Sequence, residues 1–293
     1  MKRILIMLMS CQNDFFVKQE QDCKNTFLSN LPDNIDYLIY RGGYNENKYN
    51  QNEHLLELTS LDDLKNTFSK TYDALKFVKD NLKYDYIFRT NTSTYINIEL
   101  LNSFVQQLTN TDEIWGGELV FNAEVSNDIL YLRGNGLLFS TKYLDFIYKL
   151  GLPMRLISNQ VIDDYGLGAI FRTFEISSRK TLLRVFSEGW YKSSKGPYSP
   201  HRICRMNNEN KDFDFLKNIM SIQIKNWYDR DLESQHFNEI HNVFLENKFD
   251  DINKSIEFVY EYSKHPSMFL GEQYGFIDVY YENGQYIQKM EQS

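Results

Sequence analysis

The chain begins with an uninterrupted apolar run, Ile4 to Met9, which stops at the polar segment Ser10-Cys11-Gln12-Asn13. Such a run is typical of a strand in a parallel sheet that is covered on both faces. It is too short for a membrane span or for the apolar part of a secretory signal, so we expect a cytoplasmic protein. We therefore interpret residues 4–9 as the first strand of an α/β fold.

Strand-like and helix-like segments alternate over residues 1–205, which predicts a mixed, mainly parallel sheet flanked by helices. Beyond Met206 the pattern becomes polar with helical spacing, so residues 206–293 are expected to form a mainly helical C-terminal extension. Ligands of such sheets bind at the carboxyl ends of the strands, which points to the loops after 4–9 and 84–88. Strands are expected at 4–9, 36–40, 84–88, 131–139 and 182–186 and from Trp115, and helices at 60–81, 97–108, 140–150 and 161–171.

Charge is unevenly distributed along the chain. A net charge of −8 argues against a general nucleic-acid binder, which usually has a basic face. Between Arg172 and Arg205, however, eight Lys or Arg stand against two acids, so this segment is either a phosphate site or a solvated basic surface. The three cysteines, Cys11, Cys23 and Cys204, lack metal-ligand spacing and fit free thiols in a reducing compartment.

Four blocks, in the same order, resemble the β-1,3-galactosyltransferase and Fringe type of GT-A glycosyltransferase. Residues 84–97, YDYIFRTNTSTYIN, are similar to the family's strand "ilKtDdDtfvn", which ends in the metal-binding DxD motif. Residues 134–140 resemble its acceptor-side "GsGyllS", and residues 163–168 resemble its "EDVyvG". Residues 4–10 resemble its first strand and nucleotide-contacting loop, so the resemblance covers about residues 1–205.

This resemblance implies a GT-A-like domain that transfers a hexosyl group, with inversion, from a UDP-sugar to a saccharide or lipid-linked glycan, in surface-glycan, capsule or lipopolysaccharide assembly. It implies no nucleic-acid partner, and no transmembrane segment is evident, although peripheral membrane association stays open. Gly134, Asn135 and Gly136 would line the acceptor side. The donor-binding residues implied by the resemblance are Ser10, Arg89, Thr90, Asn91, Thr92 and Ser93. The basic segment adds His201, Arg202 and Arg205 as candidates for contact with the donor diphosphate.

The acid pair Asp163-Asp164 is the candidate catalytic group. In an inverting transfer one carboxylate accepts the proton of the attacking hydroxyl. We expect Asp164 in this role, with Asp163 as the alternative. Two acids at the start of a helix also have a purely structural explanation, because carboxylates favourably meet the helix dipole there.

The block 91–93 departs from the family pattern. Asn91, Thr92 and Ser93 offer neutral oxygens where DxD offers two carboxylates, so manganese or magnesium is doubtful and no cofactor is certain. Arginines can stabilise a leaving diphosphate instead. Lys70, on the expected helix 60–81, is interpreted as a solvated lysine. Two rivals remain: a sugar-phosphate transferase, and a degenerate domain that binds nucleotide or glycan without turnover.

Overall fold

The computed structural model describes residues 1–108, 115–121, 130–157, 162–178, 184–185, 221–224, 232–246, 277–282 and 285–290. Its helices are α1 (Asp14–Asn25), α2 (Thr67–Asn81), α3 (Ile98–Gln107), α4 (Leu144–Ile157), α5 (Asp163–Ser178) and α6 (Leu232–Glu246), with 3-10 turns at Leu64–Asn66 and Thr141–Tyr143. Its strands are β1 (Ile4–Met9), β2 (Ile35–Arg41), β3 (Lys48–Asn50), β4 (Leu55–Glu57), β5 (Tyr86–Asn91), β6 (Thr94–Ile96), β7 (Trp115–Phe121), β8 (Leu130–Ser140), β9 (Arg184–Val185), β10 (Ser221–Gln223), β11 (Ile277–Glu282) and β12 (Gln285–Met290).

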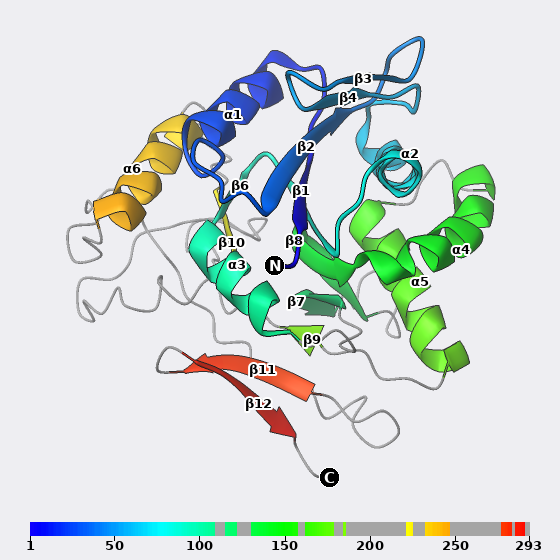
Figure 1. Cartoon of the computed structure of the whole chain (residues 1–293). Helices are drawn as coiled ribbons and strands as arrows, with labels where there is room; N and C mark the ends of the chain where they lie inside the picture. Colours follow the sequence, from blue (N-terminus) through cyan, green and yellow to red (C-terminus); the bar gives the residue numbers. More distant parts are fainter. Residues whose placement is uncertain are drawn as a thin grey trace.

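A seven-stranded sheet in the order β3-β4-β2-β1-β5-β8-β7 forms the centre of the molecule (Figure 1). The four strands β4, β2, β1 and β5 run parallel to one another. Strand β3 pairs antiparallel at one edge, and β8 and β7 continue the sheet antiparallel at the other. The α/β architecture with a mixed sheet flanked by helices is therefore confirmed.

Strand β1 is covered on both faces, as its apolar run predicts. Ile4, Ile6 and Leu8 pack into a core that includes side chains of α1, α3 and α6. Leu5 and Met7 point to the other face, into a core with α2, α4 and α5. Because successive strand residues alternate between faces, only a continuously apolar sequence fits this position.

The expected helix starts are partly correct. Asn97 caps α3 by accepting a hydrogen bond from the Leu100 N–H (3.1 Å), as expected. The helix expected from Ser60 begins later, with a 3-10 turn at Leu64 and α2 proper at Thr67. Asp63 caps that turn by accepting from the Asn66 N–H (3.0 Å), so Ser60 is not the cap.

Helix α1 was not expected from the sequence. Asn13 caps it by accepting from the Phe15 N–H (3.0 Å). Its buried residues are Gln19, Glu20 and Cys23, so its inner face is largely polar. A search for apolar side chains at helical spacing therefore misses it.

Described segments of residues 206–293 pack onto the N-terminal part of the chain. Strand β10 pairs antiparallel with β6, and β11, which forms a hairpin with β12, pairs in parallel with β9. Helix α6 lies beside α1, where Ser234 donates a hydrogen bond to Asp22 (2.6 Å) (Figure 1). The extension thus contains strands as well as a helix, and residues 221–223, expected to be helical, form β10. None of the described helices is both long and apolar enough to cross a bilayer.

Candidate functional site

Three of the four sequence blocks meet where β5 and β8 approach the first turn of α5. Strand β5 pairs with β1 so that Asn91 lies opposite Met9, and with β8 so that Arg89 lies opposite Leu137. This register brings Gly134 beside the end of β5. The fourth block ends at Ser10, one residue beyond the end of β1. The carboxyl ends of the two central strands thus share one edge with the acid pair of α5.

Arg89 is a fully buried cation at the centre of this arrangement. It follows Ile87 on the face of β5 that is covered by α2, α4 and α5. Its Nη1 donates to the carbonyl of Gly134 (2.8 Å), its Nε donates to the Tyr40 hydroxyl (3.3 Å), and its Nη2 forms an ion pair with Asp163. Burial alone would lower the pKa of Arg89, but the charge of Asp163 and the contact with Tyr40 outweigh it, so the pKa is raised. Arg89 therefore stays charged inside the protein.

Asp163 faces inward together with Arg89. Its Oδ2 accepts a hydrogen bond from the Thr71 hydroxyl (3.3 Å), and its N–H donates to the Thr67 hydroxyl (3.2 Å). The Thr71 hydroxyl also lies 3.0 Å from the Tyr40 hydroxyl. Asp163 is only 4% exposed, and this network holds the start of α5 against α2 and β2. Its carboxylate is thus occupied as a structural partner of Arg89.

Asp164 lies next to this pair and is the more open of the two acids. Its Oδ2 accepts from the Gly134 N–H (3.3 Å), and its Oδ1 accepts from the Tyr165 N–H (2.8 Å). Burial, and then the charge of Asp163, raise the pKa of Asp164 to about 6, with Arg89 and the two hydrogen bonds opposing the rise. A carboxylate of this pKa is a stronger base than an ordinary aspartate and is still ionised at neutral pH.

The block 91–93 forms a closed turn between β5 and β6. The side-chain oxygen of Asn91 accepts three hydrogen bonds, from the Ser93 N–H (3.1 Å), the Ser93 hydroxyl (2.7 Å) and the Thr94 hydroxyl (3.0 Å). The Thr92 hydroxyl is buried and donates to Gln19 (2.9 Å). Among the described residues, no three His, Cys, Asp or Glu side chains are grouped as metal ligands. Because the Asn91 oxygen is already saturated, this turn does not fit a divalent ion.

The acceptor-side block lies directly against these residues. A Cβ at Gly134 would lie 2.6 Å from Nη1 of Arg89, so only glycine allows this contact without a shift. The backbone carbonyl of Asn135 accepts a hydrogen bond from the Thr90 hydroxyl (2.8 Å). Gly136 is buried between Phe88 and Ser221, whereas Gly134 is partly exposed. The structure therefore places Gly134 at the candidate site, and the acceptor role of all three residues stays a prediction.

A second polar cluster lies at the ends of β1 and β2. Lys70 is 3% exposed: its ammonium donates to the carbonyl of Ser10 (2.6 Å) and forms an ion pair with Asp62 (2.6 Å). Asp62 also accepts from the N–H groups of Gln12 (2.7 Å) and Gly42 (3.2 Å). The expectation of a solvated Lys70 was wrong, because the helix buries this residue against the end of β1. The cluster joins the loops that follow β1, β2 and β4.

Some residues of this region were missed in the sequence, and others lie beyond the described part of the chain. Tyr40 and Asp62 carry no sequence signal, although Gly42-Gly43 marks the end of β2 and Gly43 has a φ of 80° that favours glycine. Ser10, Thr90, Thr92 and Ser93 are buried, and their donor-binding roles remain predictions. His201, Arg202 and Arg205 lie outside the described residues, as does Cys204.

Comparisons with known proteins yield structural likeness alone. No family model and no curated protein sequence matches the chain. The solved structure of the galactosyltransferase LgtC with donor and acceptor sugar analogues is 10% identical, with a TM-score of 0.45 over 81% of this chain and 95% of that chain. A glycosyltransferase involved in glycosylation of the major capsid of PBCV-1 is 11% identical, with a TM-score of 0.43 over 80% and 99%. Apo GlyE of Streptococcus pneumoniae is 13% identical, with a TM-score of 0.37 over 59% and 44%. These likenesses are too distant to support an argument about activity.

Proposed function

We propose that this protein is a glycosyltransferase that moves a hexosyl group from a nucleotide sugar, UDP-linked, to a saccharide acceptor with inversion. The acceptor belongs to surface-glycan, capsule or lipopolysaccharide-type assembly, and the enzyme works in the cytoplasm. The observation that carries the proposal is the contact between Asp164 and Gly134. It joins the block that resembles a catalytic acid motif to the block that resembles an acceptor loop, at the ligand-binding edge of the sheet.

Asp164 has the properties that the proton transfer requires. Its raised pKa makes it a competent base, and the hydrogen bonds that it accepts from the Gly134 and Tyr165 N–H groups fix its orientation. As the acceptor oxygen forms its bond to the anomeric carbon, the carboxylate takes the hydroxyl proton. The bond from the anomeric carbon to the diphosphate oxygen breaks, and its electron pair leaves with UDP.

The leaving diphosphate needs positive charge because two phosphates develop additional charge as the bond breaks. Arg89 points inward and contacts Asp163 and the carbonyl of Gly134, so its role is to hold these residues in place and not to contact the diphosphate. We assign direct diphosphate contact to His201, Arg202 and Arg205 of the basic segment. The loops held together by Asp62 and Lys70 border the nucleotide.

One observation favours a rival in which the domain binds ligand without turnover. The turn at Asn91 is internally saturated, so it supplies neither carboxylate nor free oxygen to a metal. A domain that lost this function could retain binding alone. Measured sugar transfer, which needs Asp164, distinguishes an active transferase from a domain that only binds ligand.

The test is calorimetric titration of the whole protein with UDP, in manganese and again in EDTA, followed by a screen of UDP-hexoses for transfer. We expect binding in both buffers, and transfer that the Asp164→Asn variant loses while it retains UDP binding. UDP binding with no transfer to any offered saccharide would favour the rival. Absence of UDP binding in both buffers would contradict the proposal.

A further inference from the structure

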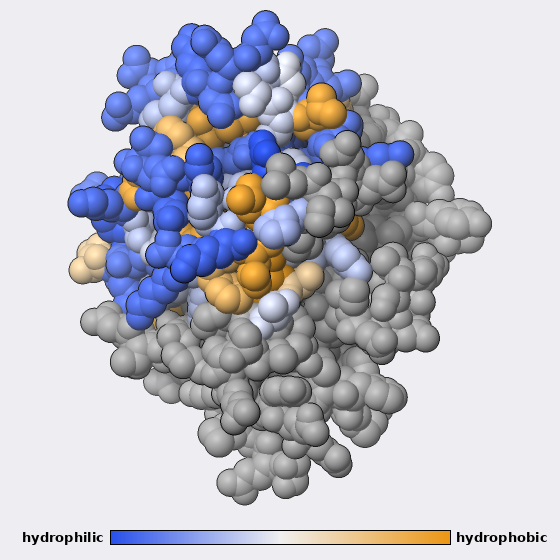
Figure 2. Space-filling model, turned by 90° about the vertical axis from the view of Figure 1, so that its right-hand side faces the viewer, coloured by the Kyte–Doolittle hydropathy of each residue, from blue (hydrophilic) through white to orange (hydrophobic). Residues whose placement is uncertain are grey.

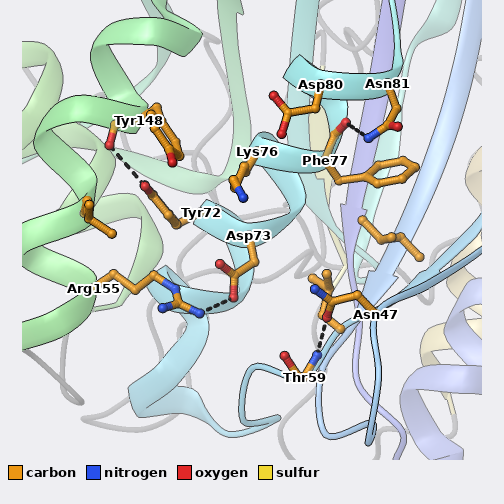
Figure 3. A pocket seen from close by; sticks show the side chains of 13 residues that line it. Asn47, Thr59, Tyr72, Asp73, Lys76, Phe77, Asp80, Asn81, Tyr148 and Arg155 are labelled. Atoms are coloured by element: carbon orange, nitrogen blue, oxygen red, sulfur yellow. Dashed lines mark hydrogen bonds and ion pairs between the residues drawn. The ribbon is translucent and has the colours of Figure 1, made fainter.

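A separate pocket lies between α2, α4 and the end of β4, on the flank of the molecule (Figure 3). Its volume is about 400 Å³, within the usual range for small-molecule sites. This flank faces the viewer in Figure 2, where hydrophobic residues lie among hydrophilic ones. Residues from all three elements line it: Leu56, Leu58, Thr59, Tyr72, Asp73, Lys76, Phe77, Asp80, Asn81, Tyr148, Leu152 and Arg155, together with Asn47.

The pocket does not overlap the candidate active site. On α2, the contacts to that site come from Thr67, Lys70 and Thr71, in the first half of the helix. The pocket uses other residues of the same helix, from Tyr72 and Asp73 as far as Asn81, and none of these three residues lines it. Thr71 and Asp80 are nine positions apart, which corresponds to about 13 Å along the helix.

Aromatic rings form part of the wall. The rings of Tyr72 and Tyr148 are stacked, with centroids 5.8 Å apart and planes 13° from parallel, and the Tyr72 hydroxyl donates to the Tyr148 carbonyl (3.1 Å). Figure 3 shows Phe77 on the other side of Lys76 from Tyr148. A Cβ at Gly151 would lie 2.7 Å from the Tyr72 ring, so this glycine allows α4 to approach α2 closely. The wall is therefore closely packed and partly apolar.

Polar groups of both signs line the rest. Asp73 Oδ2 accepts hydrogen bonds from Arg155 (2.8 Å) and from the Ser60 hydroxyl (2.5 Å), and no described residue donates to its Oδ1. Lys76 and Asp80 are exposed, and neither is in an ion pair among the described residues; the ammonium of Lys76 lies over the Tyr148 ring, 6.0 Å from its centroid. The lining thus has two carboxylates against two cations, and donors and acceptors are both available.

This balance selects the class of ligand. An anionic ligand would meet the carboxylates of Asp73 and Asp80, and a cationic one would meet Lys76 and Arg155. A wholly apolar ligand would leave these groups without partners. A neutral molecule with many hydroxyls and one apolar ring face can hydrogen-bond to both kinds of group and pack on the aromatic wall. A pyranose ring has this combination.

We propose that the pocket between α2 and α4 binds a neutral hexopyranoside, as a second saccharide site outside the candidate active site. It would hold glycan to the enzyme surface without taking part in bond formation. The inference depends on the lining alone and holds whether or not the protein is a transferase, because it is tested by binding.

The probe is methyl β-D-galactopyranoside, with methyl β-D-glucopyranoside as a second ligand, titrated into the full chain and followed by saturation-transfer NMR. We expect at least one glycoside to bind and the linear polyol sorbitol, which has no ring face, to bind at least tenfold more weakly. Lys76→Ala and Asp80→Asn should each weaken glycoside binding about tenfold, as expected for lost hydrogen bonds to charged groups. Lys83→Ala, an exposed lysine just beyond α2, is the matched control and should leave binding unchanged.

Further measurements separate this site from the candidate active site. Excess UDP should not displace the glycoside, and Asp164→Asn should bind it as the natural sequence does. Displacement by UDP, loss of binding in Asp164→Asn, unchanged affinity in both Lys76→Ala and Asp80→Asn, or no binding of either glycoside would each overturn the inference. Thermal melting of every variant identifies any that fails to fold, and Thr59→Val, which removes one exposed hydroxyl, replaces such a variant.

Discussion

The N–H of Gly134 donates a hydrogen bond to the Asp164 carboxylate over 3.3 Å, which ties β8 to the first turn of α5. The carbonyl of the same Gly134 accepts from Arg89 (2.8 Å) and from Asn91 (3.1 Å). One residue of β8 therefore contacts the candidate base, the buried cation and the turn at the end of β5. Three segments that lie far apart in the sequence become one polar unit at this point.

Gly134→Ala tests this unit. The added Cβ would lie 2.6 Å from Nη1 of Arg89, so the buried side chain must move. We expect a loss of about 1–3 kcal/mol in the free energy of unfolding, as for other overpacked positions, and a large loss of transfer activity. Gly151→Ala is the matched control: it crowds the Tyr72 ring in the same way but lies away from Asp164. Similar destabilisation in both, with activity lost in Gly151→Ala as well, would argue against a local effect at Asp164.

Asp164→Asn should change how stability depends on pH. The folded-state pKa of Asp164, about 6, lies above the value of about 3.9 for an unfolded aspartate. The folded protein therefore binds more protons between these values, and its stability falls as the pH rises from about 4 to about 6. An asparagine cannot ionise, so the variant should be about 1–2 kcal/mol more stable than the natural protein at pH 7.5 and similar at pH 4. Urea unfolding at the two pH values measures the difference.

The same carboxylate should govern catalysis. If Asp164 accepts the proton, activity rises with pH through a midpoint of about 6 and reaches a plateau above it. Asp164→Asn should lower the rate of transfer by at least about 100-fold while UDP binding remains. A flat activity profile from pH 5 to 8 in the natural protein would assign the proton to another group.

The buried pair of Arg89 and Asp163 should show strong coupling. Arg89→Met leaves the Asp163 carboxylate without its cation inside the protein, which costs about 3–5 kcal/mol. Adding Asp163→Asn removes that charge, so the double variant should recover part of the loss. A double-mutant cycle by urea unfolding measures the coupling, and purely additive effects would contradict an ion pair.

The turn at Asn91 should resist conversion into a metal site. In Asn91→Asp, the group that donates to the Gly134 carbonyl becomes an oxygen, and two acceptors then face each other. We expect a lower melting temperature, with a loss of about 1–3 kcal/mol. Manganese should not raise the melting temperature of the natural protein or of this variant. A clear manganese stabilisation of the natural protein would place a metal site elsewhere in the chain.

The central strands of the sheet were predictable because they are strongly apolar, whereas β3 and β4, of three residues each, were not expected. The run 4–9 and the segment before Arg89 have the pattern of buried strands, and the structure confirms both. Helix α1 was not predictable, because its buried face holds Gln19 and Glu20, whose partners are other polar side chains. Gln19 accepts a hydrogen bond from Thr92, and Glu20 forms an ion pair with Arg41. Hydrophobic periodicity contains no signal for a helix of this kind.

The sequence predicted which segments form the candidate site, but it did not predict which way their side chains point. The sequence places Arg89 at the end of a strand, and an arginine there suggests contact with phosphate. The direction in which Arg89 points depends on how side chains alternate between the two faces of β5. Ile87 and Arg89 lie on the face that is covered by α2 and α5. The carboxylate that pairs with Arg89 belongs to Asp163, on a helix that is distant in the sequence. The inward pairing therefore follows from tertiary packing alone.

The inward position of Arg89 also limits how this chain can change over generations. A substitution at Arg89 leaves the buried charge of Asp163 unpaired, and a substitution at Asp163 leaves the guanidinium of Arg89 unpaired. Neither single substitution is therefore neutral for stability. Descendants should therefore keep both residues or replace both with uncharged ones. In an alignment of such sequences these two columns should change together, while Lys83, which faces water, varies freely.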